Sequence, residues 1–177
     1  MYTVTIPVKA YVGKFIFARY RQPVWEVNKQ ERIGKVIYCM LERMPHRYEK
    51  CNLKLGSTLQ LQICHDYAVR KGLYLSNSSI LEFNDFVQME LIEEIAMYAW
   101  QVKNRIGLKK YKELYVRHNR AKTNRVSVIQ DPNLYQYLEK REIIYDILKL
   151  YDISEDDFPY ETVFKAVQRL KLPLLTA

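Results

Sequence analysis

Residues 2–8 read YTVTIPV and residues 58–63 read TLQLQI, and these two stretches decide the predicted fold. In both, apolar and polar side chains alternate with a period of two, which is typical of a strand with one buried face. The apolar positions include Val4, Ile6, Leu59, Leu61 and Ile63. The polar positions are Thr3, Thr5, Thr58, Gln60 and Gln62. We therefore predict that the strands pair as a two-stranded antiparallel ribbon whose apolar face is covered by helices.

A helical pattern follows the first strand, and Pro7 marks the change because it cannot donate a hydrogen bond to a strand ladder. Over residues 11–20 the apolar side chains fall on one stripe, as they do on an amphipathic helix. A second helix is predicted to begin after Asn28, a residue type that caps helices, and to end at Pro45.

The second strand is followed by the same order of elements. Residues 65–71 predict a short helix that stops at Gly72. A long helix is predicted to begin within residues 76–79, where Ser79 and Glu82 have the spacing of a capping box. The chain therefore contains the order strand, helix, turn, helix twice.

The two copies of this pattern lie in residues 2–44 and 58–100, at an offset of about 56 residues. The unit resembles the ribbon-helix-helix family of DNA-binding proteins, in which an alternating strand leads directly into a helix, often through a proline. The resemblance implies that two strands pair into one antiparallel ribbon that enters the DNA major groove, here as a tandem within one chain. The chain also resembles small phage and mobile-element proteins.

The polar face of such a ribbon has the chemistry of a base reader. A two-stranded ribbon fits the major groove, glutamine pairs with adenine N6 and N7, and the threonine methyl contacts the thymine methyl. The expected base-reading residues are Thr3, Thr5, Thr58, Gln60 and Gln62. The alternative is that these side chains only solvate the outer face of a small sheet.

Positive charge is concentrated in residues 103–125, which hold nine basic side chains and one acidic side chain in a chain of net charge +8. Such a stretch repels itself unless an anionic partner lies against it, and nucleic acid is the commonest such partner. Helix starts offer free backbone N–H groups to phosphate as well. The predicted phosphate-binding residues are Arg19, Arg21, Asn28, Lys29, Ser76, Asn77, Ser78, Lys109, Lys110, Lys112, Arg117, Arg120, Lys122 and Arg125.

Residues 131–177 predict a C-terminal helical hairpin. One helix begins at Asp131 and runs to about residue 151, and Ser154 with Asp157 gives a capping signal before the last helix. The acidic run in residues 155–157 would repel phosphate where a helix-turn-helix reader meets DNA. We therefore expect these helices to pack or to contact a protein, either another copy of the chain or a different partner.

Several classes of protein are excluded by what the sequence lacks. No apolar run reaches the roughly 18 residues of a membrane span, and the N-terminus shows no secretion signal. Cys39, Cys51 and Cys64 are read as free thiols of a cytoplasmic protein. Because no phosphate-binding loop, nucleophile motif or zinc spacing is present, we expect no enzymatic activity, no cofactor and no metal.

These observations predict an α+β, mostly helical chain in three parts. Residues 1–106 form the tandem strand-helix-helix domain, residues 107–130 the basic segment, and residues 131–177 the helical hairpin. The predicted function is binding of double-stranded DNA as a sequence-specific transcriptional regulator. Two alternatives stay open. One is an RNA or single-stranded nucleic-acid binder that stacks bases on Tyr111 and Tyr115. The other is a non-enzymatic phage or mobile-element interaction or structural protein.

Overall fold

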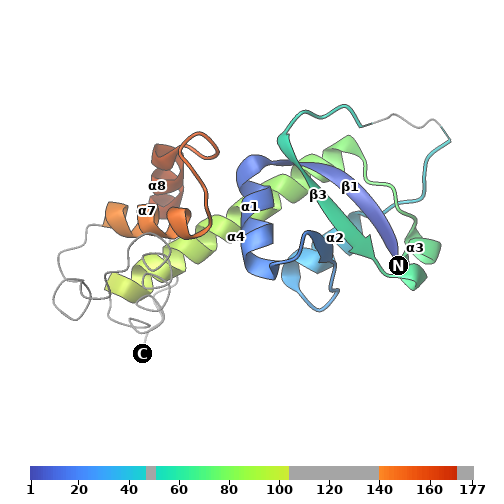
Figure 1. Ribbon diagram of the computed structural model, residues 1–177, viewed down its shortest axis with the longest axis horizontal. Helices are drawn as coiled ribbons and strands as arrows, with labels where there is room; N and C mark the ends of the chain where they lie inside the picture. The colour runs from blue at the N-terminus through green and yellow to red at the C-terminus, as the bar shows by residue number, and fades with distance from the viewer. Residues whose placement is uncertain (47–50, 104–139, 171–177) are drawn as a thin grey trace. The chain divides into compact units, whose positions relative to one another are not determined.

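The strands form a mixed three-stranded sheet in the computed structural model, which describes residues 1–46, 51–103 and 140–170 (Figure 1). Strand β1 (Tyr2–Lys9) pairs antiparallel with β3 (Gly56–Ile63), and Val4 lies opposite Leu61. The predicted pairing of these two strands is therefore confirmed. Strand β2 (Val24–Glu26) runs parallel to β3 on its other edge. The two-stranded ribbon is therefore wrong, because a third strand occupies the free edge of β3.

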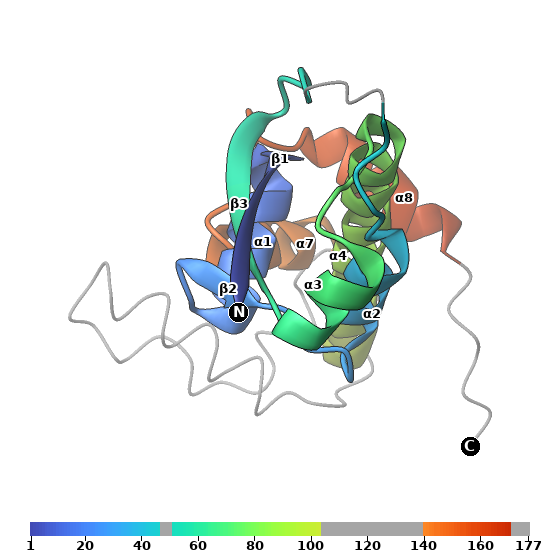
Figure 2. The same cartoon turned by 90° about the vertical axis from the view of Figure 1, so that its right-hand side faces the viewer.

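Four helices of the described chain follow the strands in the expected places. Helix α1 (Ala10–Tyr20) begins directly after β1, and α2 (Arg32–Met40) follows β2. Helix α3 (His65–Lys71) follows β3 and stops at a glycine with φ of 98°, as predicted, and α4 (Asn77–Lys103) is the long helix. Figure 2 shows the sheet with α1, α2 and α3 on one side of it.

The core of residues 1–89 lies between the sheet and the helices α1, α2 and the first part of α4. Its fully buried large side chains include Ile6, Phe15, Ile16, Trp25, Ile33, Ile37, Leu61, Ile63 and Phe83. The alternation read from the two long strands holds in the structure, because Ile6, Leu59 and Leu61 are buried while Thr5 and Gln60 are exposed. The α+β, mostly helical class is therefore confirmed, whereas the tandem symmetry is not, since only the first half contains a second strand.

Two predicted helix caps are wrong. Helix α2 begins only at Arg32, because the side chain of Asn28 accepts a hydrogen bond from the Gln30 N–H at 2.9 Å and closes a turn before the helix. At the start of α4 the cap is Ser76, whose Oγ accepts a hydrogen bond from the Ser79 N–H at 3.2 Å. The position of each cap depends on the preceding loop, which the spacing of residues alone does not specify.

A buried asparagine ties α4 to the junction between β1 and α1. Asn84 is fully buried, and its Oδ1 accepts a hydrogen bond from the Lys9 N–H at 2.7 Å while its Nδ2 donates to the Ile80 carbonyl at 2.7 Å. The Lys9 ammonium also pairs with Asp85 at 2.9 Å. Because its amide oxygen and nitrogen both have partners, Asn84 contributes to holding α4 in one register against β1.

Residues 90–177 form a second compact unit, to which the last part of α4 belongs. Its other described helices are α7 (Lys140–Leu150) and α8 (Tyr160–Arg169), which lie within the helices predicted there. The predicted helix start at Asp131 lies outside the described residues. Ser154 donates from its N–H and its hydroxyl to the Asp157 carboxylate, at 2.8 and 2.6 Å, so this pair closes a turn before α8. Of the basic stretch in residues 103–125, all but Lys103 lies outside the described residues.

Candidate nucleic-acid interface and the pocket beside it

The outer face of the sheet carries all five predicted base-reading residues. Thr3 lies opposite Gln62 and Thr5 opposite Gln60 across the β1–β3 pair. Gln62 is half-buried, and the other four residues are exposed. Within the described chain none of the five side chains makes a hydrogen bond, so their polar groups are available to a partner.

Strand β2 extends this face in a way that the sequence did not reveal. Val24 lies beside Gln60, and Glu26 lies beside Gln62. The outer face therefore carries two rows of side chains, each running across the three strands. The row that contains Gln62 ends in the exposed carboxylate of Glu26. A carboxylate can accept a hydrogen bond from cytosine N4, but it repels phosphate.

The predicted phosphate-binding residues fall in several places. Arg19 extends over the Phe15 ring at 5.9 Å, and Arg21 is exposed with a left-handed backbone at the end of α1. Ser76, Asn77 and Ser78 lie together at the start of α4, where Ser76 already serves as the cap. Asn28 and Lys29 line a pocket instead. The seven residues from Lys109 to Arg125 lie outside the described part of the chain.

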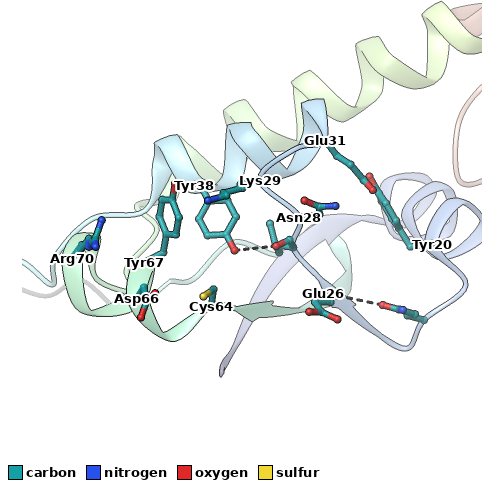
Figure 3. A pocket seen from close by; sticks show the side chains of 12 residues that line it. Tyr20, Glu26, Asn28, Lys29, Glu31, Tyr38, Cys64, Asp66, Tyr67 and Arg70 are labelled. Carbon is teal, nitrogen blue, oxygen red and sulfur yellow. Dashed lines mark hydrogen bonds between the residues drawn. The ribbon is translucent and has the colours of Figure 1, made fainter.

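This pocket is an open hollow of about 670 Å³ at the carboxyl ends of the parallel strands β2 and β3 (Figure 3). Its lining comes from residues within 20–31, from Tyr38 on α2, and from residues within 64–70. No single segment of the sequence indicates this pocket, because these segments meet only after the sheet has formed.

Tyr20 and Glu31 form one wall of the pocket, and Figure 3 shows the Glu31 side chain extending toward Tyr20. Burial raises the pKa of the Tyr20 hydroxyl, and the neighbouring Glu31 carboxylate raises that pKa further, first as a hydrogen-bond acceptor for the hydroxyl and then as a nearby negative charge. Tyr20 Oη and Glu31 Oε2 are both buried, and neither has a hydrogen-bond partner of normal geometry in the described structure.

The opposite wall holds two more tyrosines. The Tyr38 hydroxyl donates a hydrogen bond to the Val27 carbonyl at 2.9 Å, which joins α2 to the segment after β2. The Tyr38 and Tyr67 ring centroids are 4.3 Å apart, and the Lys29 ammonium lies 5.8 Å from the Tyr67 ring. Burial raises the pKa of the Tyr38 hydroxyl.

The raised pKa of Tyr20 predicts how the stability of the protein depends on alkaline pH. Below the ordinary pKa of 10 both states keep the proton, and the full stability is present. As the pH rises above 10, the unfolded chain loses the proton before the folded chain does, so stability falls. Tyr20→Phe should flatten this fall, as measured by urea unfolding between about pH 8 and 11. Parallel curves for the two proteins would contradict this assignment.

Comparisons of the chain with protein-family models, with curated proteins and with solved structures gave no match. In the described residues, histidine, cysteine and carboxylate side chains nowhere gather in threes as a metal ion would require. None of the described helices combines the length and the apolar character needed to cross a membrane. All three cysteines are free thiols.

Proposed function

We propose that the protein binds double-stranded DNA in a sequence-specific manner, as a transcriptional regulator, with the outer face of its sheet in the major groove. The observation that carries this proposal is the matched array of threonine and glutamine on β1 and β3. Its side chains have no partners within the described structure. The helix-backed sheet fixes the backbone positions of these groups, and their side chains can hydrogen-bond to base edges.

The major groove admits a two-stranded ribbon, and here that ribbon is the β1–β3 pair. Neighbouring strands lie about 4.8 Å apart, so the axes of the outer two of three strands are already roughly 10 Å apart in a groove about 12 Å wide, and β2 must lie at the groove edge. Strand β2 is only three residues long, so the widest part of the face is short. Gln60 and Gln62 occupy the central strand, where they are the most central polar groups of the face.

Charge favours a polyanionic partner. The described residues up to position 89 contain 11 basic and 6 acidic side chains, and residues 103–125 add a further balance of +8. Basic side chains supply the part of DNA affinity that does not depend on base sequence. The Glu26 carboxylate at the edge of the face repels phosphate, so Glu26→Gln should strengthen binding to all duplexes.

The proposal predicts that Gln60→Ala and Gln62→Ala each cost about 1–3 kcal/mol on the best site and relax the sequence preference, because each removes hydrogen bonds to a base. The measurement is selection from random duplex DNA, followed by titration of the selected site. Gln168→Ala is the matched control, since this exposed glutamine lies on α8 in the other unit.

Three results would count against this function. Unchanged base preference in both glutamine variants would remove the sheet from the reading surface. Tighter binding to single-stranded or RNA probes than to duplex DNA would favour the single-strand alternative. Absence of any nucleic-acid binding by the full chain at low salt would favour an interaction or structural protein.

A further inference from the structure

The pocket lies at a place in the sheet where ligands commonly bind. In open sheets with parallel strands, the loops that leave the carboxyl ends of those strands form the ligand crevice. Here β2 and β3 are the parallel neighbours, and the pocket is lined by Glu26 at the end of β2 and by Cys64 directly after β3. Glu26 also lies at the edge of the proposed DNA-binding face, but Tyr20, Glu31 and Tyr67 do not, so the inference does not rest on that function.

The pocket has the opposite charge balance to the protein as a whole. Three carboxylates line it, those of Glu26, Glu31 and Asp66, against the cations Lys29 and Arg70. In the structure as described, none of these five groups forms an ion pair within 4.0 Å. The lining therefore carries one net negative charge in a chain that carries +8 overall. A net negative pocket in a basic protein selects for a cationic ligand.

Buried polar atoms in the same pocket point to a hydrogen-bond donor. Glu31 Oε2 and Tyr20 Oη are both buried, and although the two side chains interact with each other, neither atom has a hydrogen bond of normal geometry. A buried carboxylate without a well-formed hydrogen bond costs free energy, and a ligand N–H that donates to Glu31 would recover it. Tyr20 is held in place by its ring, which stacks on Trp25 with 4.8 Å between the centroids.

Tyrosine rings in the pocket offer a second kind of attraction to a cation, through their faces. Tyr20, Tyr38 and Tyr67 line the pocket from different elements, and ammonium and guanidinium groups are attracted to the faces of such rings. The Lys29 ammonium, 5.8 Å from the Tyr67 ring, already occupies one such position. We propose that this pocket binds an organic cation with an alkylammonium or guanidinium group, seated against Glu31 and Tyr20. The cation is carried by a free amine or by a basic side chain.

The test is calorimetric titration of the full chain with agmatine, which carries both cationic groups and no carboxylate. Agmatine should bind, and Glu31→Gln should weaken it at least about tenfold, the loss expected for one charged hydrogen bond. Glu82→Gln is the charge-matched control, because Glu82 is exposed on α4 and does not line the pocket. Glutarate, an anion of similar length, should not bind.

A second arm separates the two sources of the cation, with a capped peptide that contains one arginine. Binding of either probe with loss in Glu31→Gln supports the proposal, and the tighter probe identifies the source. Equal affinity of the Glu31→Gln and unsubstituted proteins overturns it, as does glutarate binding as tightly as agmatine. If Glu31→Gln unfolds, Glu26→Gln replaces it, because Glu26 is exposed and its substitution removes a charge from the same pocket.

Discussion

Gly34→Ala is expected to lower the free energy of unfolding by about 3 kcal/mol or more, although alanine normally stabilises a helix relative to glycine. Gly34 is buried in α2, and a Cβ added there would lie 2.0 Å from the Asn28 carbonyl oxygen and 2.8 Å from its carbon. Both atoms belong to the backbone, so they cannot move aside as a flexible side chain would. Either α2 or the segment after β2 must shift, and that segment lines the pocket.

Gly13→Ala is the matched control for this prediction. Gly13 also lies inside a helix, but the nearest atom to its added Cβ is the Ser57 hydroxyl at 3.3 Å, which can rotate away. This variant should be neutral or stabilise by up to about 1 kcal/mol. Urea unfolding of both variants measures the difference. Equal stability of the two would mean that α2 and the segment around Asn28 are not in contact as described.

Trp25→Ala is expected to cost about 3–5 kcal/mol, because it removes the largest side chain of the core. Trp25 is 1% exposed, lies beside Leu61 in the sheet, and stacks on Tyr20 with an interplanar angle of 22°. The substitution should therefore weaken ligand binding in the pocket as well, since Tyr20 forms one of the pocket walls. Thermal or urea unfolding gives the stability, and agmatine titration gives the effect on the pocket.

Trp25→Phe separates the volume of this side chain from its polar atom. The Trp25 Nε1 is buried without a hydrogen-bond partner, which costs free energy in the folded protein. Phenylalanine keeps the ring stacking and removes that buried donor, so its loss should be less than half that of alanine. A loss below about 1 kcal/mol for Trp25→Ala would show that this tryptophan is not the packed centre described here.

The alternation in residues 2–8 and 58–63 was enough to predict β1, β3 and their pairing. It also assigned the outward residues correctly, because a period of two leaves only one way to bury Ile6 and Leu61 together. Short strands give no such signal. Strand β2 has three residues, too few to show a period, so the sequence left the edge of β3 unoccupied.

The pocket could not have been predicted from any local pattern. Tyr20 and Glu31 are 11 residues apart, Tyr67 follows 36 residues later, and each taken alone reads as an ordinary surface or core residue. They meet because β2 joins β3 in parallel and so brings the segments after both strands to one end of the sheet.

The sequence by itself determined the two long strands, the order of the helices and which side of β1 and β3 is polar, because hydrophobic periodicity is a local property of the chain. The tertiary structure alone decided the third strand, the contact between Asn84 and Lys9, and the convergence of Tyr20, Glu31 and Tyr67. These features depend on strand pairing and close packing between segments that are distant in the chain, and no residue spacing encodes them.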